Sequence, residues 1–161
     1  MAEKTIDTKD REILITRLLN APRELVWEAW TKPEHVKHWW GPNGFTNTIH
    51  EMEVRPGGVW RFIMHGPDGR DFPNKIVFNE VVKPERLVYT HSSDDDNDPN
   101  VFHTTVTLED RDGKTAITMR AVFATAEERD RVVKEYGALE GAKQNVERLA
   151  TYLEKMGLST G

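Results

Sequence analysis

Five clusters of turn residues divide the region from residue 45 to 123 into short segments that are typical of β-strands. The clusters are Pro56-Gly57-Gly58, Pro67-Asp68-Gly69, Lys83-Pro84-Glu85, the acidic stretch 94–100 and Asp112-Gly113. The segments between them, such as WRFIMH and RLVYTH, are rich in β-branched and aromatic residues, which favour strands. Because links of two to seven residues are too short for parallel crossovers, we expect six consecutive antiparallel strands here.

The part of the chain before this region predicts one strand and two short helices. Apolar residues at even spacing in EILITRLLN indicate a first strand that ends at about Asn20. Pro22 then opens a helix, since the missing N–H of proline is harmless in a first turn. Thr31 and Glu34 stand three apart as a capping box, and predict a second short helix that ends before the Gly-Pro pair at 41–42.

The C-terminal part predicts one long helix. Thr125 and Glu128 form another capping box, and the chain from there to about Met156 is expected to be helical throughout. One apolar stripe runs along it: Leu139, Ala142, Val146, Leu149, Leu153 and Met156. Such a stripe must be buried against a wide partner, and the sheet is the one available.

These elements predict an α+β fold in the order β-α-α-β6-α, with a curved antiparallel sheet wrapped around the C-terminal helix. At 161 residues the chain fits one domain, expected over residues 11–157 with tails at 1–10 and 158–161. The net charge is −5 with no basic block, which argues against a nucleic-acid partner. The absence of cysteine excludes disulfides and thiolate metal sites. With no long apolar run and no signal peptide, we expect a cytoplasmic protein without a membrane partner.

Four stretches follow one another in this element order: ITRLLNAPRELVWEAWTKPEHVKHWWGP, EMEVRPGGVWRFIMHGPDG, KPERLVYT and GALEGAKQNVERLATYL. Together they resemble the START-like superfamily called SRPBCC, and within it the branch homologous to the activator of the ninety-kilodalton heat-shock chaperone's ATPase. Trp39-Trp40-Gly41-Pro42 and Arg55-Pro56-Gly57-Gly58 are the more specific signatures. The resemblance implies a helix-grip fold with a hydrophobic cavity between sheet and long helix. In various members this cavity holds lipids, polyketides or other apolar ligands.

The chain departs from this resemblance at two points. The eukaryotic activator carries an additional chaperone-binding domain, for which this sequence has no room. Family members often place a large aromatic residue after the glycine of the last helix, whereas Ala142 follows Gly141 here. We expect the smaller side chain to leave space inside the cavity.

The last helix and two strands supply the residues expected to line the cavity. Small residues gather in the helix between Gly137 and Ala142, although an interior glycine costs ~1 kcal/mol relative to alanine. The rows expected to face this helix are Trp60, Phe62 and Met64 on one strand, and Ile117, Met119, Ala121 and Phe123 on another. The same residues would also suit an ordinary core. The candidate ligand-binding residues are Trp40, Phe45, Trp60, Phe62, Met64, Ile117, Met119, Ala138, Gly141, Ala142, Asn145 and Leu149.

Four tryptophans lie in the two short predicted helices: Trp27, Trp30, Trp39 and Trp40. One interpretation is that they anchor helices that are marginal alone in water onto the open end of the sheet. The other is that Trp40 and Phe45, which flank the loop 41–44, form an entrance gate that contacts the ligand.

The histidines do not form a recognisable metal site. His35 and His38 stand three apart on a helix without the carboxylate of a helical zinc motif. His91 and His103 lie opposite each other if the acidic stretch closes a symmetric hairpin about Asn97, and such a pair is half a metal site at best. The acidic stretch itself lacks the glycine and glutamate of a calcium loop. We therefore expect neither a metal nor a cofactor.

Catalytic machinery is also hard to find. Serines occur only in loop or tail contexts, and no nucleophile elbow or glycine-rich phosphate loop is present. Three carboxylates fall within predicted strands: Glu51, Glu53 and Glu80. The arginines available to neutralise them are Arg55, Arg61 and Arg86. If one carboxylate instead faces the cavity with a raised pKa, it would act as the general base of a cyclase-like enzyme.

The leading hypothesis is a non-catalytic binding protein, a monomer or weak homodimer, that holds a small apolar, lipid-like or aromatic ligand between the sheet and the C-terminal helix. The alternatives are an interaction module that regulates a chaperone's ATPase and a polyketide-cyclase-like enzyme.

Overall fold

The computed structural model describes residues 11–93 and 101–160. The strands within them are β1 (Glu12–Leu19), β2 (Thr46–Met52), β3 (Val59–His65), β4 (Asp71–Val82), β5 (Arg86–Ser93), β6 (Phe102–Arg111) and β7 (Lys114–Val122). The helices are α1 (Arg23–Thr31), α2 (Pro33–Val36), α3 (Ala126–Tyr136) and α4 (Ala138–Thr160). None of the helices in these two ranges has the length and apolar character needed to span a bilayer.

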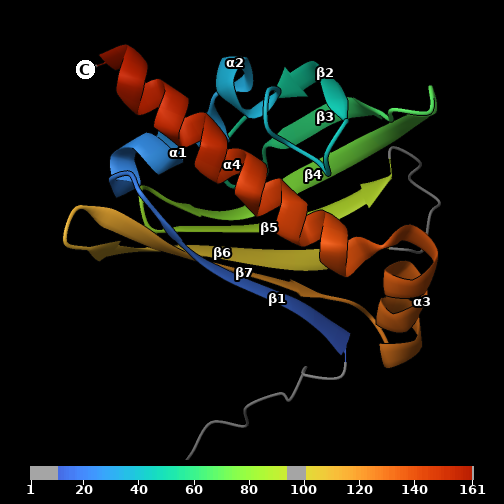
Figure 1. Cartoon of the computed structure of the whole chain (residues 1–161). Helices are drawn as coiled ribbons and strands as arrows, with labels where there is room; N and C mark the ends of the chain where they lie inside the picture. The colour runs from blue at the N-terminus through green and yellow to red at the C-terminus, as the bar shows by residue number, and fades with distance from the viewer. Residues whose placement is uncertain (1–10, 94–100, 161) are drawn as a thin grey trace, which may run out of the picture.

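All seven strands belong to one sheet in the order β1-β7-β6-β5-β4-β3-β2. Each pair of neighbours is antiparallel, so β2 to β7 form the expected meander and β1 completes the sheet beside β7. Register shifts between Ile49 and Glu51 and between Phe78 and Glu80 mark bulges, which bend a sheet. The curved sheet grips α4, and the predicted α+β helix-grip fold is confirmed (Figure 1).

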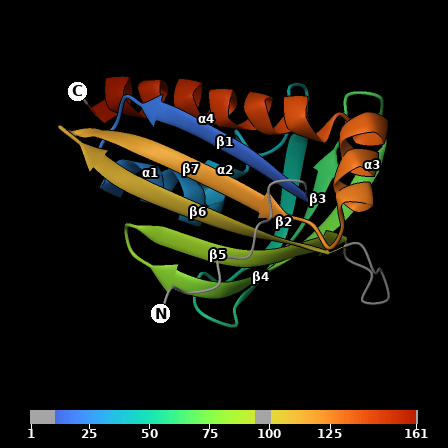
Figure 2. The ribbon, with the colours of Figure 1, turned by 90° about the horizontal axis from the view of Figure 1, so that it is seen from below.

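Helix α4 packs against the sheet and runs along the top of Figure 2, beside β1. Val146, Leu149 and Leu153 are fully buried there, as the apolar stripe predicted. Leu139 is 39% exposed, because it lies in the first turn of α4, next to the junction with α3 and outside the packed part of the stripe.

The single helix predicted from residue 125 to 156 is wrong, because the structure contains two helices. Thr125 caps the first one as expected, since its Oγ1 accepts a hydrogen bond from Glu128 N at 3.0 Å. Gly137 then adopts a left-handed conformation with φ 61°, and its N–H bonds back to carbonyls of the last turn of α3. Glycine takes this conformation without steric cost and so ends helices. Helix α4 continues to Thr160, beyond the domain boundary expected at residue 157.

The capping box predicted at Thr31 is also wrong. Thr31 is the last residue of α1, and its hydroxyl donates to the carbonyl of Trp27 at 2.7 Å. Lys32 is extended, as expected for a residue before proline, and Pro33 starts α2. The second helix spans four residues and ends at Val36, earlier than predicted, with turns leading to Trp40.

Helices α1 and α2 are attached to the sheet through tryptophans. Trp27, Trp30 and Trp39 are buried, and the rings of Trp30 and Trp39 meet edge to face at 4.9 Å. Trp39 Nε1 also donates to the carbonyl of Ala29 at 3.0 Å, which ties the segment after α2 to α1. This is the anchoring arrangement expected from the sequence. Because α1 follows the end of β1, these side chains fill one end of the concave face and leave the other end to α3 and the start of α4.

Candidate functional site

A cavity of about 220 Å³ lies between the sheet and the N-terminal half of α4. The sheet contributes Ile13, Ile15, Met64, Tyr89, His91, Phe102, Thr104, Met119, Ala121 and Phe123. The loop between α2 and β2 contributes Trp40, Gly41 and Pro42, and the start of α4 with its junction to α3 contributes Gly137, Gly141, Ala142 and Asn145. An apolar cavity of ~150 Å³ is enough to hold benzene, so this one suits a compact ligand of one or two rings or a short chain.

The space exists because the side chains of α4 are small where the helix crosses the cavity. Ala142 and Gly141 stand at the cavity wall, whereas Leu149 and Leu153 fill the interface further along the helix. At Gly141 an added Cβ would lie 3.2 Å from Pro42 Cγ, so the glycine lets the loop approach the helix closely. This contact explains why the helix tolerates a residue of low helix propensity there.

Arg148 fastens the loop between α2 and β2 to α4. Its guanidinium donates to the carbonyls of Trp40, Gly41 and Pro42 at 3.1, 3.0 and 2.8 Å, and to those of His38 and Phe45 at 3.2 and 3.0 Å. Burial lowers the pKa of Arg148 from its ordinary value. The guanidinium is thus the hydrogen-bond donor, in place of water, for five carbonyls of the loop that supplies one wall of the cavity.

Asn145 and Gln144 bind the same loop through its N–H groups. Asn145 Oδ1 accepts from Gly41 N and Gln144 Oε1 accepts from Asn43 N, both at 3.0 Å. Three residues in one stretch of α4 therefore hold the loop by side chain to backbone hydrogen bonds. Asn145 also lines the cavity, so loop attachment and cavity shape depend on the same helix turn.

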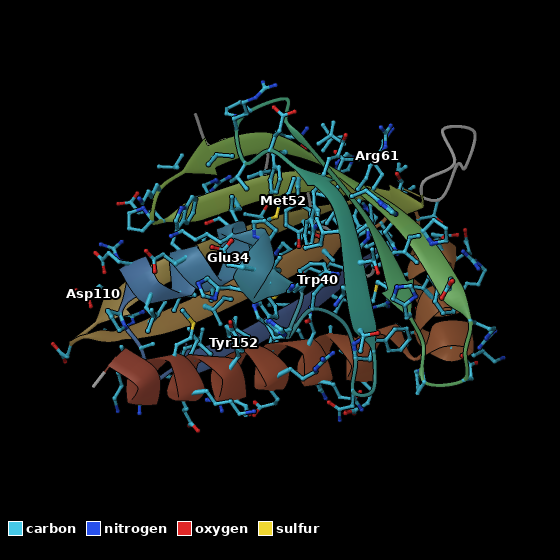
Figure 3. All side chains as sticks on the ribbon, turned by 90° about the horizontal axis from the view of Figure 1, so that it is seen from above. Glu34, Trp40, Met52, Arg61, Asp110 and Tyr152 are labelled. Atoms are coloured by element: carbon cyan, nitrogen blue, oxygen red, sulfur yellow. The ribbon has the colours of Figure 1, made fainter. Side chains whose placement is uncertain are left out.

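Aromatic rings form a continuous wall on the sheet side. The rings of His91 and Phe102 lie 4.8 Å apart, and those of Phe102 and Phe123 lie 4.9 Å apart. Figure 3 labels Trp40 between the sheet and α4. The centroid of its ring lies 6.4 Å from that of the His91 ring. Together with two methionine side chains, these rings favour an aromatic guest.

His91 is held as a neutral base in this wall. Asn74 Nδ2 donates to the carbonyl of Phe72 at 2.7 Å, so Asn74 Oδ1 is the acceptor at 2.9 Å from His91 Nε2. Nε2 therefore carries the proton, and in the neutral ring Nδ1 is an acceptor. Burial lowers the pKa of His91 to about 4, which keeps the ring uncharged at neutral pH.

The other polar groups of the cavity are also neutral. Tyr89 is buried, and this burial raises the pKa of its hydroxyl, against a smaller opposing effect of its hydrogen bond with Thr104. No lysine, arginine, aspartate or glutamate occurs among the described residues that line the cavity. A charged ligand would find no counter-ion there, so the site is suited to an uncharged one.

The environment of His91 predicts a pH dependence of stability. In the unfolded chain the imidazole takes up a proton near its usual pKa of about 6.5, whereas in the folded protein it stays neutral until about pH 4. Its contribution to stability is therefore complete above pH 6.5 and is lost as the pH falls to 4. Between pH 6.5 and pH 4, we expect the free energy of unfolding of His91→Gln to fall by about 3 kcal/mol less than that of the wild type. Urea unfolding at each pH measures this difference.

The control for this experiment is His50→Gln, at an exposed histidine of β2. We expect its pH profile to follow that of the wild type. Parallel profiles for His91→Gln and the wild type would show that the imidazole is not desolvated.

Six of the twelve residues predicted from the sequence line the cavity: Trp40, Met64, Met119, Gly141, Ala142 and Asn145. Four others are core residues at most 1% exposed: Trp60, Phe62, Ile117 and Leu149. These four share a face with cavity residues but lie toward the end of the sheet that α1 and α2 fill. Phe45 packs beside Phe72, with ring centroids 6.0 Å apart, and is not part of the lining. The side chain of Ala138 lies outside what the structure describes.

The sequence analysis missed the contribution of the middle strands. Tyr89 and His91 on β5 and Phe102 and Thr104 on β6 all face the cavity. The two-residue period in RLVYTH and VFHTTVTLE would have grouped them, since each pair stands two apart.

The predicted pairing of His91 with His103 is wrong. His91 pairs with Phe102, and His103 pairs with Thr90. This register differs by one residue from a hairpin symmetric about Asn97, and such a shift moves a side chain to the other face of the sheet. His91 therefore faces the cavity, while His103 is exposed and its Nδ1 lies 3.0 Å from Thr90 Oγ1.

The other two histidines considered as ligands contact a tyrosine of α4. His35 Nδ1 lies 2.7 Å from Tyr152 Oη, and the ring of His38 stacks on Tyr152 with centroids 5.9 Å apart. Within residues 11–93 and 101–160 no group of three or more histidine, aspartate or glutamate side chains is placed to hold a metal ion. The acidic stretch considered as a calcium loop lies outside the described residues.

The three strand glutamates lie outside the cavity, so the proposed cavity base is not found among them. Each carboxylate forms an ion pair with an arginine: Glu51 with Arg61 at 3.6 Å, Glu53 with Arg55 at 2.8 Å, and Glu80 with Arg86 at 3.1 Å. All three carboxylates are exposed. These are the arginines expected to neutralise them. In Figure 3 Arg61 lies on the side of the sheet away from α4, as the alternation with buried Trp60 and Phe62 requires.

A Thr-His-Asp chain of hydrogen bonds lies on the outer side of β2, β3 and β4. Thr48 Oγ1 is 2.7 Å from His65 Nε2, and His65 Nδ1 is 2.7 Å from Asp71 Oδ1. The order of groups is the one that activates a hydroxyl nucleophile. All three residues lie outside the cavity and Asp71 is 59% exposed, so water competes for each of these hydrogen bonds.

The fold and the cavity define the class of this protein as a helix-grip domain with a neutral, aromatic-walled cavity. The model of the family described as Activator of Hsp90 ATPase homolog 1-like protein matches residues 20–154. The chain belongs to this family, a branch of the SRPBCC superfamily.

Several solved structures share the fold over nearly the whole chain. A solution structure of a protein from Arthrobacter aurescens is 26% identical, with a TM-score of 0.84, and the match covers 94% of this chain and 90% of that one. The crystal structure of NE0264 from Nitrosomonas europaea is 27% identical, with a TM-score of 0.80 over 95% of this chain and 99% of that one. The crystal structure of CV1439 from Chromobacterium violaceum is 26% identical, with a TM-score of 0.78, and the match covers 89% of this chain and 97% of that one.

The names of these three proteins state no activity, so they support the fold and the family but no particular function. None of the curated proteins compared matches the chain.

Proposed function

We propose that this protein binds one small, uncharged, apolar ligand in the cavity between the sheet and α4, without converting it chemically. The observation that carries the proposal is the cavity itself, a space of about 220 Å³ with an aromatic wall and no charged side chain among its described lining residues. Affinity would come from apolar burial. A one-ring ligand that buries ~200 Å² gains about 5 kcal/mol, which corresponds to a dissociation constant of roughly 0.2 mM.

The chemistry of the lining supports binding rather than catalysis. The strand glutamates point to the outer side of the sheet, and the lining residues that the structure describes include no carboxylate or amine to serve as general acid or nucleophile. His91 is the one imidazole among the described lining residues, and the other titratable group there, the hydroxyl of Tyr89, stays protonated because burial raises its pKa. A cavity of this composition suits a carrier or a sensor of an apolar molecule.

The proposal is tested by amide-shift mapping with toluene and indole at concentrations up to a few millimolar. We expect shifts to concentrate on cavity residues such as Met119, Ala121 and Ala142, with the outer residues Arg61 and Glu80 unaffected. Denaturing mass spectrometry of small molecules extracted from the purified protein would identify a retained ligand. Shifts confined to outer-face residues, or none at saturating probe, would refute the proposal.

The family description favours a second candidate, regulation of the ATPase of the ninety-kilodalton heat-shock chaperone. This role would use the surface of the domain and not the cavity. It is tested by measuring the ATPase rate of the chaperone with and without a saturating amount of this protein. An unchanged rate discards this candidate and leaves the binding proposal intact.

A further inference from the structure

We propose that the ligand carries a phenolic hydroxyl group, and that this hydroxyl donates a hydrogen bond to His91 Nδ1. This inference rests on the proposed function, and it names the chemical class of the ligand and the residue that selects it. It follows from the tautomer of His91, from the neutrality of the cavity and from the aromatic wall around the imidazole.

The tautomer is fixed by a relay of hydrogen bonds through β4. The carbonyl of Phe72 binds Asn74 Nδ2 at 2.7 Å, which leaves Asn74 Oδ1 to accept from His91 Nε2 at 2.9 Å. The proton of the neutral ring is therefore on Nε2, and Nδ1 presents a lone pair. Among the residues that the structure describes, no side chain or backbone group donates to that nitrogen.

His91 Nδ1 is not among the buried side-chain atoms that lack a partner, so it is open to water, and a donor on the ligand would take the place of that water. The donor must be neutral, because the described lining holds no carboxylate to balance an ammonium group. The ligand is not a carboxylate either, since a lone pair on Nδ1 repels an anion and no cationic side chain occurs among the described lining residues. A hydroxyl group meets both conditions.

The surroundings of His91 favour an aromatic carrier for this hydroxyl. The imidazole lies 4.8 Å from the ring of Phe102 and 6.4 Å from that of Trp40, so a ring next to the acceptor would meet aromatic faces and edges. Met119 and Met64 line the same cavity and adapt well to aromatic guests. A phenol places an apolar ring and one strong donor within the dimensions of the cavity.

The test uses three probes of similar size in calorimetric or shift titrations. p-Cresol offers a donor, 4-methylanisole keeps the oxygen without the donor, and p-xylene has neither. We expect the wild type to bind p-cresol about three to ten times more tightly than 4-methylanisole, the range of one neutral hydrogen bond. His91→Phe keeps a ring in the wall and should abolish this preference while p-xylene still binds. His103→Phe, at the exposed histidine of β6, should leave the preference unchanged.

A second measurement does not depend on a variant that folds. In wild-type protein with ¹⁵N-labelled histidine, free His91 should show the Nε2–H tautomer, and p-cresol should shift the Nδ1 resonance while p-xylene leaves it nearly in place. Equal affinities for p-cresol and 4-methylanisole, or an Nδ1 resonance unmoved by bound p-cresol, would overturn the inference although the cavity still binds p-xylene. If none of the three probes binds, the proposed function fails and this inference fails with it.

Discussion

Substitution of Ala142 by phenylalanine is expected to abolish ligand binding and to leave the protein folded. The side chain at this position lines the cavity from α4, and a phenylalanine ring there would occupy much of the 220 Å³. We expect the affinity for p-cresol to fall at least ten-fold, equivalent to about 1.4 kcal/mol or more. Because the ring fills existing space, the melting temperature should stay the same or rise by a few degrees. Isothermal calorimetry and thermal unfolding measure the two effects.

The matched control is Glu140→Phe, which places the same ring on an exposed position of the same helix. Its affinity for p-cresol should equal that of the wild type. Unchanged binding by a folded Ala142→Phe protein would mean that the ligand lies elsewhere. A large drop in its melting temperature would instead show that the cavity is too small to take the ring.

Removal of Arg148 is expected to have the largest effect on stability. In Arg148→Ala, the carbonyls of residues such as Trp40, Gly41 and Pro42 lose a half-buried charged donor. We expect a loss of about 3 kcal/mol, and a fall in melting temperature of roughly 6–12 °C for a domain of this size. Because the loop supplies part of the cavity wall, the affinity for apolar probes should also fall.

Two variants separate the geometry of Arg148 from its charge. Arg148→Lys keeps the charge, but an ammonium group has too few N–H donors to bind five carbonyls at once. We therefore expect it to recover only a minor part of the stability that Arg148→Ala loses. Arg17→Ala removes an exposed ion pair to Glu147 and should cost less than about 1 kcal/mol. A melting temperature of Arg148→Ala close to that of Arg17→Ala would contradict the attachment role.

The strands and their inward faces could be predicted because both depend on local periodicity. Trp60, Phe62 and Met64 do face α4, and the apolar stripe of the last helix is buried at Val146, Leu149 and Leu153 and partly buried at Ala142 and Met156. The position of the cavity along that face could not be predicted in the same way. It depends on how far the tryptophans of α1 and α2 reach over the sheet, which is set by tertiary packing and not by spacing in the sequence.

Two further features depended on choices that local sequence leaves open. Gly137 and Gly141 look alike in the sequence, yet one ends α3 in a left-handed conformation and the other lies inside α4 against Pro42. The inward orientation of His91 depends on the register of β5 with β6, where one residue decides the face.

The attachment of the loop by Arg148 has no signature in the sequence. A single arginine on the polar part of an amphipathic helix is normally read as a solvated residue. Its partners are backbone carbonyls of residues 38–45, more than one hundred positions away, and backbone groups leave no trace in residue identity. Such side chain to backbone contacts become visible only once the fold has brought the segments together.

The most direct test of the central claim uses the methionine methyl groups. The sequence contains five methionines, of which Met64 and Met119 line the cavity whereas Met52 and Met156 do not. In protein with ¹³C-labelled methionine methyls, saturated with p-cresol, we expect nuclear Overhauser effects between the ligand ring and the ε-methyls of Met64 and Met119. Contacts of the bound ligand with Met52 or Met156 in their place would contradict the account.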